Sequence, residues 1–144
     1  MPGIIVGVDG SETSRRALEW AVREAGLRGV ALTVLAVHQV AGNAWTGSPE
    51  RYPQADQPII EAIRRAAEEA VQKAVSQAGE PAPASVTVRA VSGIASQELV
   101  NASSDADLVV VGSRGGGGFA KLLLGSVTGQ VVSHAASPVV VIRA

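Results

Sequence analysis

The chain has 144 residues, 47% of them hydrophobic, which gives room for one soluble domain with a real core. A net charge of −1 and the absence of a dense Lys/Arg cluster predict that neither nucleic acid nor a membrane is a partner. The sequence has no cysteine, which excludes disulfides, a thiolate nucleophile and a cysteine-based zinc site.

The first predicted element is a short apolar strand over residues 4–8, which ends at Asp9, Gly10 and Ser11. Residues 1–9 contain neither the basic segment nor the small-residue cleavage site of a secretory signal. No apolar stretch approaches the roughly 18 residues that a membrane span requires. These features predict a cytoplasmic protein.

Strand and helix patterns alternate along the chain. Apolar runs rich in β-branched residues predict five strands, over residues 4–8, 32–37, 86–91, 108–111 and 139–142. Apolar residues at helical spacing predict four helices between them, with stripes over 17–25, 59–78, 96–103 and 126–135. Ser11 or Thr13 can cap the first helix, Gly26 or Gly29 can end it, and Gly79 can end the second.

Residues 41–57 carry no recognisable pattern, although they include Trp45, Tyr52, two prolines and two glycines. The segment is long for a connection in a compact domain. Two interpretations stay open at this point: a lid over a ligand, or a disordered connection.

Several predicted strands are continuously apolar, which is typical of a parallel sheet covered by helices on both faces. Strict alternation of strands and helices predicts a doubly wound α/β fold, and we expect a five-stranded parallel sheet in the order 3-2-1-4-5. We expect residues 1–144 to form a single domain. In that order strands one and four flank the point where ligands bind, and Asp9 and Gly112 lie at their carboxyl ends.

The fourth strand runs into a glycine-rich stretch, Val109-Val110-Val111-Gly112-Ser113-Arg114-Gly115, and Gly125-Ser126-Val127-Thr128 follows after nine residues. Glycine lets backbone N–H groups approach an anion, and a helix N-terminus offers unpaired donors and a positive dipole end. The pattern therefore predicts a phosphate site. The alternative is that these residues are merely turn glycines and a helix cap. The chain has no Gly-x4-Gly-Lys-Ser/Thr sequence, so it is not a P-loop protein of the usual kind.

The spacing Gly-x2-Gly-x9-Gly-Ser resembles the nucleotide-binding signature of the universal stress protein family, in its ATP-binding branch. The opening residues 4–11 and the closing residues 137–143 resemble the first and last strands of that family. The resemblance implies a nucleotide site made by Gly7, Val8, Asp9, Val37, Val111, Gly112, Arg114, Gly115, Gly125, Ser126, Val127 and Thr128.

The resemblance also implies individual roles. Asp9 would lie beside the ribose or a Mg²⁺ held mainly by the phosphates, although an Asp before Gly and Ser is also ordinary turn chemistry. The backbone of Val37 would contact the adenine edge. Gly7 departs from the family pattern, where proline or alanine is frequent, so its contact with the sugar or base would be looser. Arg114 would pair with a phosphate or simply be solvated.

The expected function is therefore ATP binding by a stress-response regulatory protein that switches or stabilises a homodimer. The resemblance implies dimerisation through an edge strand formed by Val139, Val140, Val141 and Ile142. Three alternatives stay open: a cyclic AMP binder, a slow ATPase or self-phosphorylating enzyme, and an interaction protein in which nucleotide is structural. No residue is assigned a catalytic role.

Overall fold

The computed structural model of the protein describes residues 3–39, 53–113 and 125–143. Within these ranges the chain forms five strands: β1 (Gly3–Val8), β2 (Ala31–Gln39), β3 (Ser85–Gly93), β4 (Ala106–Gly112) and β5 (Val139–Ile142). It also forms four helices: α1 (Glu12–Arg28), α2 (Pro53–Ala78), α3 (Ala95–Ser103) and α4 (Ser126–His134). None of these helices combines the length and the hydropathy needed to cross a membrane.

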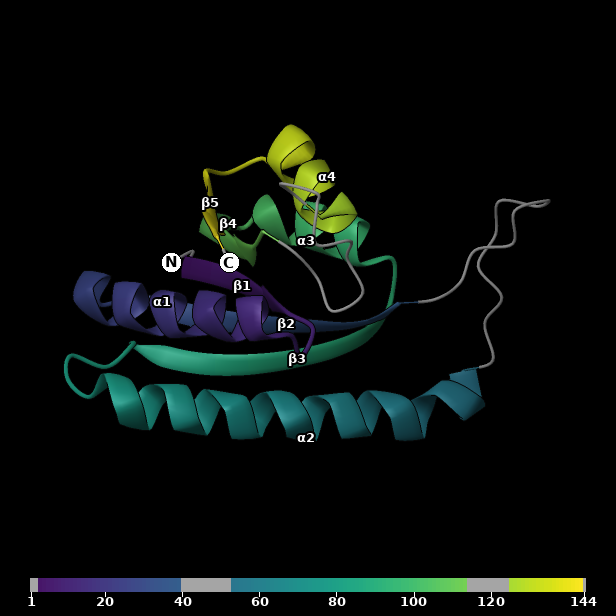
Figure 1. The fold of residues 1–144 in the computed structure, drawn as a ribbon, viewed down its shortest axis with the longest axis horizontal. Coiled ribbons are helices and arrows are strands. Elements are labelled where there is room, and N and C mark those ends of the chain that lie inside the picture. Colours follow the sequence, from purple (N-terminus) through teal and green to yellow (C-terminus); the bar gives the residue numbers. More distant parts are fainter. Residues whose placement is uncertain (1–2, 40–52, 114–124, 144) are drawn as a thin grey trace.

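The strands form one parallel sheet in the order β3-β2-β1-β4-β5, which confirms the predicted topology (Figure 1). Helices α1 and α2 cover one face of the sheet, and α3 and α4 cover the other. The strands buried on both faces are continuously apolar for this reason, as in Val109–Val111 of β4.

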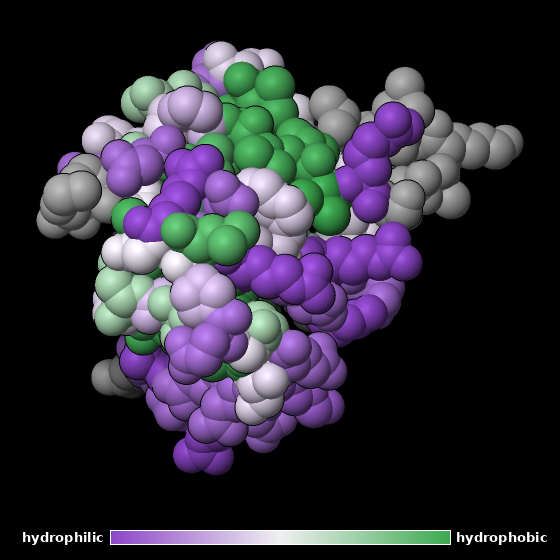
Figure 2. All heavy atoms as spheres, turned by 90° about the vertical axis from the view of Figure 1, so that its left-hand side faces the viewer, coloured by the Kyte–Doolittle hydropathy of each residue, from purple (hydrophilic) through white to green (hydrophobic). Residues whose placement is uncertain are grey.

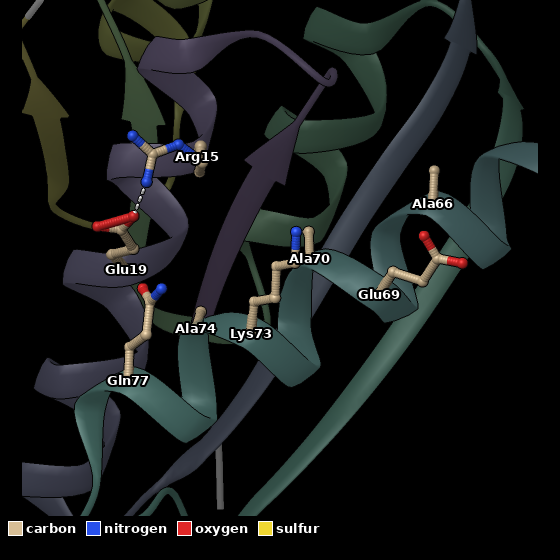
Figure 3. A pocket seen from close by; sticks show the side chains of 8 residues that line it. All are labelled: Arg15, Glu19, Ala66, Glu69, Ala70, Lys73, Ala74 and Gln77. Carbon is tan, nitrogen blue, oxygen red and sulfur yellow. Dashed lines mark hydrogen bonds and ion pairs between the residues drawn. The ribbon is translucent and has the colours of Figure 1, made fainter.

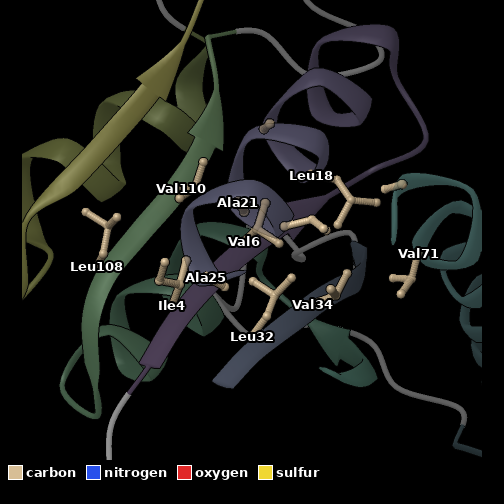
Figure 4. Close-up of a cluster of buried hydrophobic side chains, with 13 residues drawn as sticks. Ile4, Val6, Leu18, Ala21, Ala25, Leu32, Val34, Val71, Leu108 and Val110 are labelled. Carbon is tan, nitrogen blue, oxygen red and sulfur yellow. The ribbon is translucent and has the colours of Figure 1, made fainter. Parts of the chain in front are cut away.

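The two faces bury separate apolar clusters. On the α1–α2 face, Ile4, Val6, Leu18, Leu32 and Val110 are almost completely buried (Figure 4). The α3–α4 face is smaller and is built around the residues Ile5, Leu35, Leu99, Val109, Val111 and Val131. Burial of this apolar surface is the main stabilising contribution to the fold.

The helix ends follow the expected capping chemistry. Ser11 caps α1, and its hydroxyl accepts a hydrogen bond from the Ser14 N–H at 3.2 Å. Gly29 and Gly79 follow α1 and α2 with φ values of 67° and 68°, in the left-handed region that favours glycine.

The start of α2 differs from the expectation. The helix begins at Pro53, six positions before the first residue of the predicted stripe, so residues 53–57 belong to a helix and not to a lid or a disordered connection. Proline suits the first helical position because the N–H that it lacks would have no partner inside the helix. Residues 40–52, which make up most of the segment in question, lie outside the described residues.

The two edges of the sheet are unlike. At the β3 edge, Ser85, Thr87 and Arg89 are exposed polar residues that alternate with partly buried valines. At the other edge, all four residues of β5 are apolar and partly exposed. Figure 2, which looks at the side of the molecule where β5 lies, shows apolar side chains gathered in its upper half.

Candidate functional site

The carboxyl ends of β1 and β4 lie side by side, as predicted. The two strands are paired up to Val6 and Val110, so Asp9 and Gly112 stand just beyond the last paired residues. At this point the sheet order reverses direction, because β1 is followed by β2 on one side and β4 lies on the other. Ligands of open α/β sheets bind at such a position.

The turn between β1 and α1 is held by its own side chains. The Asp9 Oδ1 atom accepts a hydrogen bond from the Ser11 N–H at 2.9 Å, and the Asp9 N–H donates to the Ser14 hydroxyl at 3.2 Å. Gly10 has a φ of 83°. Asp9 is exposed, and its side chain stabilises the turn, as expected for Asp before Gly and Ser. A role of Asp9 in binding Mg²⁺ stays a prediction. In the described part of the chain no group of three His, Asp or Glu side chains could hold a metal ion.

Gly112 brings the end of β4 against the start of α1. A Cβ atom at this position would lie 2.8 Å from the Thr13 Cγ2 atom and 3.1 Å from the Thr13 carbonyl carbon. The first distance is shorter than real Cβ contacts and the second is tight, so a side chain at position 112 would require Thr13 or the end of β4 to shift. The neighbour of Gly112 is Thr13, which the sequence indicated only as a possible cap of the first helix.

Ser113 connects three parts of the site. Its N–H donates to the Ile142 carbonyl of β5 at 2.8 Å, and its own carbonyl accepts from the Gly125 N–H at 2.6 Å. The Ser113–Gly125 bond therefore joins the two ends of the segment 114–124. Arg114 and Gly115, both predicted to bind the nucleotide, fall within that segment and lie outside the described residues.

Helix α4 begins at Ser126, at the place where the glycine–hydroxyl pattern predicts a helix start. Gly125 is the N-cap residue with φ −68° and ψ 162°, and it makes no side-chain cap. The first-turn N–H groups, at Ser126, Val127 and Thr128, have no acceptor inside the helix and carry the positive end of its dipole. The start of α4 is therefore suited to an anion.

Thr128 has a buried hydroxyl. The side chain is 4% exposed, and its Oγ1 atom donates to the Gly112 carbonyl at 2.5 Å. The sequence pattern predicted a hydroxyl donor for phosphate at this position. The structure shows that the hydroxyl proton is used inside the protein, between α4 and the end of β4.

The remaining predicted residues divide between the two faces of the sheet. Val37 and Val111 pack in the cluster on the α3–α4 face, whereas Val8 packs on the α1–α2 face. A Cβ atom on Gly7 would lie 3.1 Å from both methyl carbons of Leu99. Leu99 of α3 therefore fills the space beside Gly7, a contact that the sequence did not indicate.

A separate groove of about 270 Å³ lies between α1 and α2 (Figure 3). Its alanine side chains are flanked by both cations and carboxylates, and Arg15 is engaged in ion pairs with Glu12 and Glu19. The hydrogen bond from Arg15 lowers the pKa of Glu12. None of the residues predicted to bind nucleotide lines this groove. The negative charges of Glu19 and Glu69 would repel a phosphate in this groove.

The chain is similar to proteins of one known family over nearly its whole length. The family model described as the universal stress protein family matches residues 2–143. A universal stress protein of Mycobacterium tuberculosis is 35% identical over 150 residues, which cover 97% of this chain and 47% of that protein. A universal stress protein of Mycolicibacterium smegmatis is 36% identical over 142 residues, covering 98% of this chain and 48% of that protein. The chain thus spans about half the length of the curated relatives that it matches.

Solved structures agree on the fold and include nucleotide complexes. A universal stress protein in complex with cAMP has a TM-score of 0.67 and 27% identity, covering 99% of this chain and 96% of that chain. The universal stress protein of Archaeoglobus fulgidus in complex with dAMP has a TM-score of 0.57 and 28% identity, covering 99% and 98%. The structure of UspA from Lactobacillus plantarum has a TM-score of 0.78 at 24% identity, covering 99% and 97%, and supports the fold alone.

Proposed function

Since the chain belongs to the universal stress protein family, we propose that it binds an adenine nucleotide, with ATP as the preferred ligand, at the carboxyl ends of β1 and β4. The observation that carries this proposal is the start of α4. Its N-cap is Gly125, which makes no side-chain cap, and hydrogen bonds to Gly112 and Ser113 hold the first turn beside the end of β4. A phosphate would supply the acceptors that the first-turn N–H groups require. Relatives that bind cAMP and dAMP support the adenine part of the ligand.

In this proposal the backbone does most of the binding. The N–H groups at Ser126 and Val127, with the exposed Ser126 hydroxyl, would donate to the phosphates. Asp9 would lie near the ribose or a phosphate-bound Mg²⁺, because hard carboxylate oxygens suit that ion. Val37, at the end of β2, would contact the adenine edge through its backbone. Arg114 and Gly115 would complete the site from the segment 114–124.

The nucleotide would be a regulatory ligand that switches or stabilises a homodimer in the stress response, rather than a rapidly consumed substrate. Fast phosphoryl transfer needs cations and a water-orienting group that act in the transition state. The described part of the site offers backbone donors, hydroxyls and one carboxylate. We therefore expect binding with slow hydrolysis, well below the roughly 1–100 s⁻¹ of ordinary kinases. A cytoplasmic location and a single domain over residues 1–144 stay predictions.

Identifying the nucleotide that the purified protein retains tests the proposed function. We expect denaturation of the purified protein to release an adenine nucleotide, which mass spectrometry would identify. Calorimetric titration of the nucleotide-free protein with Mg²⁺-ATP, cAMP and Mg²⁺-GTP should give the tightest binding for ATP, with GTP as the control for base selection. Tighter binding of cAMP would establish the alternative ligand. Production of ADP at several per second in the same samples would make the protein an enzyme.

We also propose that two copies pair through β5, as the edge strand implies. The carbonyls of Pro138 and Ile142 accept hydrogen bonds at 2.9 and 2.8 Å from the N–H groups of Val109 in β4 and of Ser113 just after it. Backbone groups alternate in direction along a strand, so those of Val139 and Val141 face the open edge. A two-fold axis would allow the same strand of a second copy to pair there antiparallel, covering an apolar edge that has no charges.

Replacing Val141 with proline should convert the dimer to a monomer. Proline removes one outward N–H at the edge but none of the hydrogen bonds to β4, and edge strands tolerate it. The matched control is Val141→Ala, which trims the side chain and keeps the N–H. Light scattering at micromolar concentration should give twice 14.6 kDa for the parent and for Val141→Ala, and 14.6 kDa for Val141→Pro. A monomeric parent would contradict the proposed dimer.

A further inference from the structure

We infer that Thr128 is a positioning residue for the phosphates of the bound nucleotide. Its hydroxyl holds the first turn of α4 against the end of β4, so that the first-turn N–H groups face the ligand. The inference rests on the proposed function, because it concerns the same site. It assigns to Thr128 an indirect role in place of the direct phosphate contact that the sequence pattern implied.

The position of the bond supports this role. Gly112 stands two residues beyond Val110, the last residue of β4 that pairs with β1. The Thr128 hydroxyl donates to the Gly112 carbonyl in a buried hydrogen bond. The first turn of α4 is therefore joined directly to the strand end that flanks the ligand position.

A second hydrogen bond also holds the start of α4 to this strand end. The Gly125 N–H donates to the Ser113 carbonyl at 2.6 Å, immediately next to the Gly112 carbonyl that Thr128 uses. Two adjacent carbonyls of one strand end thus hold two residues of one helical turn, three positions apart. One bond would leave the turn free to pivot, whereas two bonds fix its direction as well as its place. Positional accuracy of this kind decides how well backbone donors meet a phosphate.

Plain core packing makes a different prediction for Thr128. Valine has almost the shape of threonine, so a packing role would tolerate Thr128→Val. A positioning role requires the hydroxyl, because valine leaves the Gly112 carbonyl without this donor and frees the turn to move. Serine keeps the hydroxyl and lacks only the methyl group. The pair Thr128→Val and Thr128→Ser therefore separates the hydroxyl from the packed volume.

The test compares ATP with adenosine, which shares the base and the sugar but has no phosphate. Affinities for ATP are measured by calorimetry and those for adenosine by NMR titration at millimolar concentration, on the parent and both variants. We expect Thr128→Val to bind ATP about tenfold more weakly, with adenosine binding unchanged. We expect Thr128→Ser to restore ATP binding to within about threefold of the parent, since it keeps the donor.

Other outcomes are informative in distinct ways. Unchanged ATP affinity in a folded Thr128→Val variant would overturn the inference and leave the proposed function intact. Equal losses for ATP and adenosine would also overturn it, because a general disturbance of the site would explain them. A parent protein that binds neither ligand would overturn the proposed function itself. If Thr128→Val does not fold by circular dichroism, Thr128→Ala is compared with Thr128→Ser in the same ATP and adenosine titrations.

Discussion

Gly125→Val will bind ATP about 10–100-fold more weakly than the parent, because a hydrogen bond to a charged group contributes about 1.5–3 kcal/mol. Side chains at an N-cap position reach toward the N–H groups of the second and third helical residues. A valine there covers these groups with apolar atoms and cannot cap them. The phosphate would lose its donors, although the helix would remain.

The backbone of Gly125 makes this substitution a test of binding and not of folding. Its φ of −68° and ψ of 162° are open to any residue, so valine adds no backbone strain. We expect a stability loss of about 1 kcal/mol or less, the cost of a poor N-cap residue. Gly129→Ala, one turn further along α4, is the control and should bind ATP as the parent does, because no atom of the described residues lies within 4 Å of the new Cβ. Equal ATP affinities of Gly125→Val and the parent, measured by calorimetry, would show that the phosphate does not bind at the start of α4.

Gly26→Ala will destabilise the fold by about 2 kcal/mol, although alanine is the better helix former by about 1 kcal/mol. Gly26 lies in α1, and a Cβ atom there would be 2.0 Å from the Pro81 carbonyl oxygen. The turn that holds Pro81 is anchored by the hydrogen bond from the Ala84 N–H to the Val30 carbonyl at 3.0 Å. Either α1 or this turn must move, and both are attached to the sheet.

The control Gly129→Ala separates the effect of the contact with Pro81 from the effect of helix propensity. Gly129→Ala gains the propensity of alanine without a collision and should be more stable than the parent by about 0.5–1 kcal/mol. Urea unfolding followed by circular dichroism measures both variants against the parent. A Gly26→Ala midpoint at or above that of the parent would show that the turn yields easily and that the contact with Pro81 costs little.

Most of the fold could be predicted because local signals and the global pattern agree. Val109–Val111 is continuously apolar, which is what burial under helices on both faces requires, and Gly29 and Gly79 mark real left-handed helix ends. The predicted stripe of α2 began only at Ile59, whereas the helix begins at Pro53, a residue type that is accepted at the first helical position, and it continues through Pro58.

The candidate site was only partly predictable, because the chemistry of a glycine or a threonine does not say what approaches it. Gly112 looks like a phosphate glycine in the sequence, yet its tight neighbour is Thr13, which lies in another part of the chain. Thr128 looks like a surface hydroxyl and is buried. Leu99 beside Gly7 depends on how α3 packs on the sheet, which helical spacing does not specify.

The unlike edges of the sheet determine how far association can proceed. A copy joined through β5 presents on its far side the β3 edge, with Arg89 and its exposed hydroxyl neighbours Ser85 and Thr87. Such an edge is a poor template for another strand, and it is not the surface that β5 uses. If two copies pair through β5 as proposed, growth by strand addition would end after one step, because the β3 edge that is left open would not accept a further strand.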